Sequence, residues 1–149
     1  ALRGVNQRAD YHPEVDVFVH SMQVFYHALR ESDDIDTVLA GLLRDVGKIA
    51  GSRGHDEYGV RMLEGKVSQK TLWLISNHIR IHHFLKGEMR RLGKVQELTL
   101  DTHLFTDLVL LSRWDRMGRN PNWNPDYDRR WTSERLEDLE DAKVLRGDQ

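Results

Sequence analysis

Apolar residues recur every three to four positions along most of the chain, the spacing of one buried face of an α-helix. From Val15 to Leu29, six apolar side chains follow this spacing. The Ser32–Asp34 segment can cap the next helix, whereas Gly47 and the proline-containing segment 120–125 interrupt the pattern. We predict helices over about residues 14–31, 35–47, 56–63, 68–84, 101–117 and 133–145, with a short helix and a loop over 86–97. No segment alternates as a strand would, so we expect an all-α protein, a compact bundle of five to seven helices.

The composition suits a single globular domain of 149 residues, with 39% hydrophobic and 31% charged residues. No apolar run is long enough for a membrane span and no secretory signal is visible, so we expect no membrane partner. The chain has no cysteine, which excludes disulfides and thiolate metal sites. This fits a reducing compartment, and we expect a cytoplasmic protein. The net charge of −2 argues against a broad nucleic-acid surface, so nucleic acid is an open but less favoured partner.

Histidines and aspartates on different predicted elements are candidate metal ligands. Imidazole nitrogen and carboxylate oxygen together suit divalent ions, and helical proteins assemble such donors inside a bundle. Each residue alone also has an ordinary explanation, as a hydrogen-bonded core histidine, a helix cap or half of an ion pair. As a set they predict a metal site. The candidates are His20, Asp45, His55, His78 and Asp115.

The sequence around these residues resembles a known family. Residues 42–48, LLRDVGK, are similar to the LLHDxGK signature of the HD-domain metal-dependent phosphohydrolases. Residues 12–20, HPEVDVFVH, resemble the stretch that opens the HD domain of bacterial tRNA nucleotidyltransferases. Residues 54–60 resemble the family's HxxxG segment, and residues 114–119, WDRMGR, its last aspartate-bearing element. The resemblance implies one HD-like domain over 1–149, with a core over about 12–120 and an extension over 121–149.

In that family the matching positions hold one or two divalent ions. The resemblance implies that His20, Asp45 and Asp115 bind the first ion. It implies that His55 and His78, with Asp45 bridging, bind a second. Such centres hydrolyse phosphomonoesters, phosphodiesters or nucleoside triphosphates. The sequence does not distinguish Mn, Co, Mg, Fe, Ni and Zn.

Other residues near the motifs are candidates for substrate binding and proton transfer. Lys48 follows the motif aspartate and suits a phosphate, although most lysines are simply exposed. His82 lies one helical turn after His78, so it can contact substrate, replace His78 as a ligand or act as an acid. Asp56 and Glu57 are the nearest carboxylates for a general base, and the sequence does not choose between them. The remaining candidates, for phosphate binding, are Arg116 and Arg119, which can equally belong to a solvated face.

Arg44 stands where the family pattern has a metal-binding histidine. A guanidinium has five donors and no acceptor, so it cannot bind a cation. Three arrangements are open. The first metal can persist on His20, Asp45 and Asp115; the guanidinium can take the metal's place and pair with Asp45 or Asp115; or Arg44 can turn outward, leaving one ion at Asp45, His55 and His78.

These observations lead to three functional hypotheses. The first is a metal-dependent phosphohydrolase acting on a nucleotide or a related small phosphate ester, impaired to some degree by Arg44. Because the chain shows no nucleotidyltransferase portion, we expect a free-standing hydrolase rather than the tRNA-processing enzyme. The second is a degenerate HD module that binds a nucleotide or an RNA end without turnover. The third, less favoured, is an HD-type di-iron oxygenase. The sequence leaves the oligomeric state open.

Overall fold

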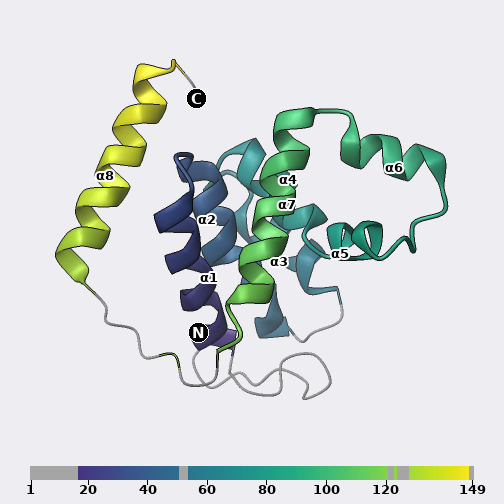
Figure 1. Ribbon diagram of the computed structural model, residues 1–149, viewed down its shortest axis with the longest axis horizontal. Coiled ribbons are helices and arrows are strands. Elements are labelled where there is room, and N and C mark those ends of the chain that lie inside the picture. The colour runs from purple at the N-terminus through teal and green to yellow at the C-terminus, as the bar shows by residue number, and fades with distance from the viewer. Residues whose placement is uncertain (1–16, 51–53, 121–122, 124–127, 148–149) are drawn as a thin grey trace.

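A computed structural model describes residues 17–50, 54–120, 123 and 128–147 of the chain. Within these ranges the protein is all-α, as predicted, with eight α-helices, one short 3-10 helix and no strand (Figure 1). The elements are α1 (Val17–Glu31), α2 (Ile35–Leu43), η1 (Val46–Ala50), α3 (His55–Leu63), α4 (Gln69–Asn77), α5 (Arg80–Leu85), α6 (Leu92–Thr99), α7 (Thr102–Met117) and α8 (Arg129–Leu145).

The eight α-helices exceed the predicted five to seven, mainly because the helix expected over 68–84 is two helices, α4 and α5. The break lies at His78. The carbonyl of Ile75 accepts hydrogen bonds from both the backbone N–H and the ring Nδ1 of His78, at 3.3 and 2.5 Å. This pairing occupies the acceptor that a continuous helix would offer to the N–H of Ile79.

Other predicted boundaries also shift. The second helix ends at Leu43 rather than near 47, and the chain continues as η1. The last helix begins at Arg129 instead of Ser133, because the Asp128 side chain caps it by accepting a hydrogen bond from Trp131 N at 2.9 Å. The ambiguous stretch 86–97 contains the start of α6.

The core lies where α1, α2, α4 and α7 meet, the group of helices at the centre of Figure 1. Fully buried side chains from all four fill it, among them Leu29, Val38, Leu74 and Leu108. Each contributes roughly 1.5–3 kcal/mol of burial free energy relative to an exposed side chain. Trp114 is also fully buried, and its indole N–H donates to Glu31 at the end of α1. This core holds α1 and α7 at the positions from which His20 and Asp115 face each other.

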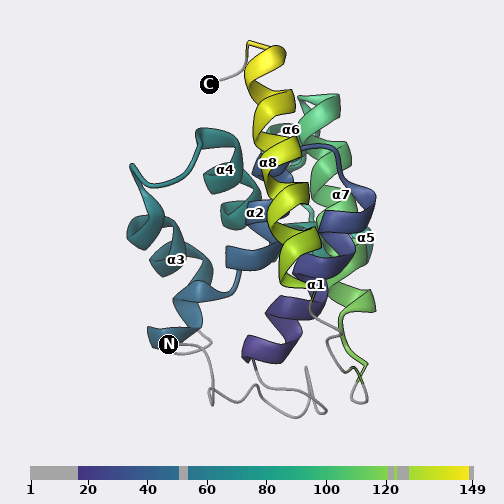
Figure 2. The ribbon, with the colours of Figure 1, turned by 90° about the vertical axis from the view of Figure 1, so that its left-hand side faces the viewer.

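Helix α8 lies along the outside of α1 and α2 (Figures 1 and 2). Arg135 donates to the carbonyls of Leu29 and Ser32 at 3.0 and 2.7 Å, satisfying acceptors at the end of α1. Lys143 pairs with Asp36 at 2.9 Å. These polar contacts fix α8 on the side of the bundle opposite to α6.

Helices α5 and α6 and the turn between them project at the other edge of the molecule, on the right of Figure 1. We name residues 80–100 the α5–α6 arm. Leu98 is the buried contact of α6, whereas Leu92 and Leu100 are largely exposed. Across the parts of the chain that the structure describes, every helix is too short or too polar to span a membrane.

Candidate metal and phosphate site

The five predicted metal ligands converge from five places in the fold. His20 lies on α1, Asp45 in the turn between α2 and η1, His55 at the start of α3, His78 just after α4, and Asp115 near the end of α7. All five are buried, with relative exposures of 0 to 7%. Buried histidines and aspartates need partners, and here they are partners of one another or of Arg44.

Three of these residues form a cluster whose ligand atoms lie close enough together to hold one cation. The Nε2 atom of His55 lies 3.1 Å from Asp45 Oδ1 and 3.1 Å from His78 Nε2, and His78 Nε2 lies 3.5 Å from Asp45 Oδ1. Because His78 donates its Nδ1 hydrogen to the carbonyl of Ile75, its Nε2 lone pair faces the cluster. A backbone carbonyl on the far nitrogen is the usual way a metal-binding histidine is oriented. Asp45, His55 and His78 therefore fit one divalent ion.

The other predicted ligands surround the Arg44 guanidinium instead. Its Nη2 atom lies 2.5 Å from His20 Nε2, 2.7 Å from Asp115 Oδ1 and 3.2 Å from Asp45 Oδ2. Arg44 is 1% exposed, so the third of the three arrangements left open by the sequence, in which Arg44 turns outward, is wrong. The guanidinium nitrogen takes the place among these groups that the first metal would take. This donor set does not fit a metal ion while Arg44 points inward.

The backbone of Gly118 orients His20 for this contact. His20 Nδ1 donates to the Gly118 carbonyl at 2.7 Å, and its Nε2 lies between Arg44 Nη2 at 2.5 Å and Asp115 Oδ1 at 2.7 Å. Gln23, one turn along α1, makes two further hydrogen bonds to the backbone of Asn120, at 3.0 and 3.1 Å. Neither Gly118 nor Gln23 was among the site residues predicted from the sequence. The signal for Gly118 was its place directly after the aspartate-bearing helix.

Asp45 joins the two halves of the site. Its Oδ2 atom faces Arg44, and its Oδ1 atom faces His55, His78 and, at 3.7 Å, Lys48 Nζ. A carboxylate with one oxygen toward each of two cations is the bridging arrangement of a two-metal centre. Here the guanidinium of Arg44 supplies the positive charge that faces one of these oxygens.

The charges of this site hold its carboxyl groups ionised. Burial disfavours charge on Asp45, but Arg44, with His55 and Lys48, outweighs it and keeps the pKa of Asp45 well below its usual range. The pKa of Asp115 is lowered in the same way, against burial, by Arg44, His20 and His82. Burial lowers the pKa of Lys48, opposed by Asp45. For Arg44 the two carboxylates overcome burial and raise the pKa.

Among the predicted substrate residues, the structure brings Lys48, His82 and Arg119 to the site. Lys48 is 9% exposed. His82 Nε2 lies 2.8 Å from Asp115 Oδ2, so His82 joins the Arg44 half rather than the Asp45–His55–His78 cluster. Arg119 Nη2 lies 3.8 Å from the same oxygen of Asp115.

The remaining predictions do not meet the cluster. Arg116 is exposed on α7, and none of the contacts between described residues joins it to the site. Glu57 is exposed on α3 and is outside the group of donors within reach of one ion. The side chain of Asp56 lies outside the described residues. The geometry therefore does not support Glu57 as the general base.

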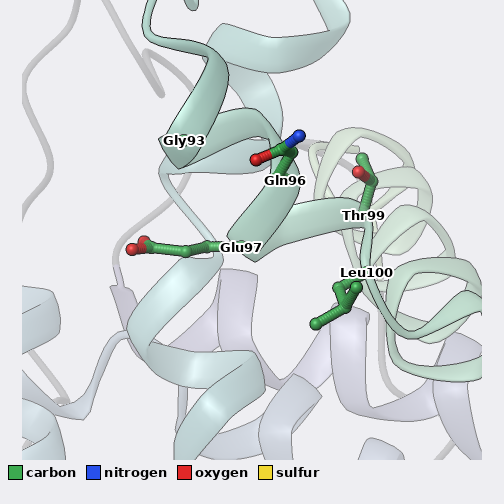
Figure 3. A pocket seen from close by; sticks show the side chains of 5 residues that line it. All are labelled: Gly93, Gln96, Glu97, Thr99 and Leu100. Atoms are coloured by element: carbon green, nitrogen blue, oxygen red, sulfur yellow. The ribbon is translucent and has the colours of Figure 1, made fainter.

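Helix α6 carries a surface depression, which none of the candidate site residues lines (Figure 3). The depression is lined by Gly93, Gln96, Glu97, Thr99 and Leu100. Glu97 is its one ionisable side chain, so the depression offers neither a metal site nor a positive charge for phosphate.

Comparisons with known proteins identify the family of this chain. The HD domain family model matches residues 17–122, and the chain belongs to the HD domain family. Among relatives, the chain is similar to the Multifunctional CCA protein of Laribacter hongkongensis, with 31% identity over an alignment that covers 80% of this chain and 34% of that protein. It is also similar to the Multifunctional CCA proteins of Burkholderia mallei and Burkholderia pseudomallei, with 52% identity over 48 residues, which are 32% of this chain and 12% of those proteins. The chain thus spans about a third or less of the length of these relatives.

Proposed function

We propose that this chain is an HD-type metal-dependent phosphohydrolase that uses one divalent ion and acts on a nucleotide or a related small phosphate ester. The observation that carries the proposal is the position of Arg44. Its guanidinium satisfies His20 and Asp115, while Asp45, which also contacts Arg44, stays assembled with His55 and His78 as a second donor set. Three protein ligands with open positions for water and substrate are sufficient for a catalytic ion.

Different residues of the site would hold the ion, neutralise the phosphate and contact the substrate. Asp45, His55 and His78 would hold the ion, which when bound supplies Lewis acidity toward the phosphoryl oxygens and acidifies water. Lys48, whose Nζ atom lies 3.7 Å from Asp45 Oδ1, would neutralise a phosphate oxygen. Arg44 would keep Asp45 and Asp115 ionised and in place. A second ion would have the same structural role. His82, oriented by Asp115 and 27% exposed, would contact the substrate from the outer side.

Metal content and phosphate release, measured together, test this proposal. Protein purified without chelator should contain about one ion per chain by mass spectrometry, as expected for one three-ligand set. It should release phosphate from some member of a nucleotide panel with Mn²⁺, Co²⁺, Mg²⁺, Ni²⁺, Fe²⁺ or Zn²⁺. His78→Gln should lose both properties, and Arg113→Gln, at an exposed position on the same helix as Asp115, should lose neither. A folded wild-type protein with neither ion nor phosphate release contradicts the proposal.

A phosphate-binding module without turnover is the second candidate. It is favoured by the balance of charge in the site, where Arg44 and Lys48 match Asp45 and Asp115 without any ion. Such a module would bind a nucleotide in chelator, measured by calorimetry, and would release no phosphate with any metal. The di-iron alternative needs two matched donor sets, and Arg44 leaves donors for one ion only.

The relatives guide the choice of substrates. They are named Multifunctional CCA proteins. The motifs also resemble the HD domain of tRNA nucleotidyltransferases, so mononucleotides with 2′, 3′ and 5′ phosphates are the first members of the panel. We also propose that this chain interacts with tRNA.

A further inference from the structure

The α5–α6 arm carries a concentration of positive charge in a chain that is negative overall. Residues 80–94 contain five lysine or arginine side chains and one carboxylate, whereas the whole chain has a net charge of −2. All five cationic side chains are exposed. They are Arg80, Lys86, Arg90, Arg91 and Lys94.

Most of these charges have no partner among the residues that the structure describes. Lys94 pairs with Glu97 at 3.5 Å, and Arg80 approaches the Asn77 side chain at 3.4 Å. By contrast, Lys86, Arg90 and Arg91 make no side-chain hydrogen bond or ion pair with any described residue. Glu88, the carboxylate of this stretch, faces His83 at 3.6 Å. The arm therefore presents at least three free cations to solvent.

Two of these three cations, Arg90 and Arg91, do not stabilise the helix beside them. Arg90 and Arg91 directly precede α6, and Arg91 is its N-cap residue without a side-chain capping bond. The N-terminus of a helix carries partial positive charge, so cations placed there are unfavourable. Lys86, in contrast, follows the C-terminus of α5 and is favourable there. The partial charge of the helix terminus therefore disfavours both arginines, whereas an external anion bound there would favour them.

The charged arm continues outward from the site. His82 on α5 contacts Asp115, and Lys86 lies one helical turn further, since its backbone N–H donates to the His82 carbonyl at 3.1 Å. That turn covers about 6 Å. The chain then runs through Arg90 and Arg91 to α6 at the edge of the molecule in Figure 1. A single phosphate at Lys48 and His82 would not reach these arginines, but a chain of phosphates would.

We propose that the α5–α6 arm binds the sugar-phosphate backbone of a single-stranded nucleic acid whose terminal phosphate lies at the site. This inference rests on the proposed function and deepens it, because it makes a strand end the preferred substrate over a free mononucleotide. It also explains how a chain of net negative charge can bind nucleic acid, since the contact needs only a local row of cations.

Binding in chelator tests the arm independently of catalysis. Fluorescence anisotropy would follow a labelled single strand of about 12 nucleotides with a 3′ phosphate, a length within the usual range for one binding surface. Wild-type protein should bind this strand more tightly than a mononucleotide. The triple variant Lys86→Gln, Arg90→Gln, Arg91→Gln should bind it roughly tenfold or more weakly. Its slope of log affinity against log salt should fall by about 2, as for the loss of three phosphate contacts on a single strand.

A matched control removes the same charges elsewhere. Arg61→Gln, Lys66→Gln and Arg129→Gln together delete one lysine and two arginines at exposed positions outside the arm. This control should bind as the wild type does, and circular dichroism should show both triple variants folded. Equal loss in the two variants, or no preference of the wild type for the strand, overturns the inference. So does equal competition by a polyglutamate peptide, which would make the arm a site for acidic proteins. Failure of metal binding or phosphate release leaves these chelator measurements unaffected, so the two proposals fail separately.

Discussion

Gly47 lies so close to His55 that a Cβ atom at position 47 would fall 1.9 Å from the backbone oxygen of His55. The same Cβ would fall 2.7 Å from the backbone nitrogen of Gly59. The obstacles are backbone atoms, which cannot turn aside as a side chain can. The glycine of the LLRDVGK segment and the glycine of the HxxxG segment thus allow η1 and α3 to touch, and this contact brings His55 to Asp45.

Gly47→Ala should therefore separate η1 from α3 and move His55 out of the metal cluster. We expect a loss of roughly 1–3 kcal/mol in the free energy of unfolding, as for overpacking elsewhere, together with weaker metal binding. Thermal unfolding and metal titration check the two effects. Gly93→Ala is the control, because a Cβ at Gly93 on α6 meets nothing within 4 Å. Unchanged metal affinity in Gly47→Ala would show that His55 does not depend on this contact.

Arg44→His should restore a second donor set. Imidazole in place of the guanidinium removes the cation that His20 and Asp115 now surround. We expect bound metal to rise from about one toward two ions per chain and phosphate release to rise roughly tenfold or more. Mass spectrometry and the nucleotide panel measure both. Equal or lower activity than wild type would count against the view that Arg44 displaces a metal ion.

Asp45→Asn should weaken metal binding more than any change of a neighbouring carboxylate. Asp45 is the one residue with an oxygen toward each half of the site, and its neutral amide would also leave Arg44 with a single carboxylate partner. We expect at least a tenfold loss of metal affinity by titration. Asp56→Asn and Glu57→Gln on α3 are the comparisons. If either of these weakens binding more than Asp45→Asn does, the metal lies elsewhere than at the HD motif.

The helical class was predictable because long periodic segments such as α1 and α7 bury one face, and periodicity reports that face directly. The convergence of the five candidate ligands followed from the ordered motifs. The family resemblance places His78 at the close of a helix, but the apolar periodicity did not predict the break there, since it depends on a side chain competing for the Ile75 carbonyl. The inward position of Arg44 also required the fold, because it depends on the placement of His20 and Asp115 from helices far apart in the sequence. The sequence was compatible with three positions for Arg44. The structure has the one in which Arg44 is buried between the carboxylates of Asp45 and Asp115.

Lys70 on α4 forms ion pairs with the residue before α2 and with the middle of α7. These ion pairs should make the free energy of unfolding depend on pH. The Nζ atom of Lys70 lies 2.5 Å from Asp34 and 2.6 Å from Asp107. Asp34 also caps α2 by accepting from Asp36 N at 3.1 Å. Burial opposes ionisation of Asp34, but hydrogen bonds from Lys70 and Thr37 lower its pKa below the ordinary 3.8. Burial likewise opposes the charge on Lys70, yet its two carboxylate partners raise its pKa above 10.5.

Because the folded pKa of Asp34 is depressed, its stabilisation is present above pH 3.8 and is lost as the pH falls through the folded pKa. Because the folded pKa of Lys70 is raised, its stabilisation is present below pH 10.5 and is lost as the pH rises through the folded pKa. Lys70→Met should thus be less stable than wild type by about 1 kcal/mol between these limits, a modest value because the group is partly solvated. Chemical denaturation across pH should show this difference shrinking below 3.8 and again above 10.5. Lys94→Met, which removes an exposed pair with Glu97, should show almost no difference at any pH. A difference for Lys70→Met that stays constant into acid would mean that the ion pairs with Asp34 and Asp107 do not account for the stabilisation by Lys70.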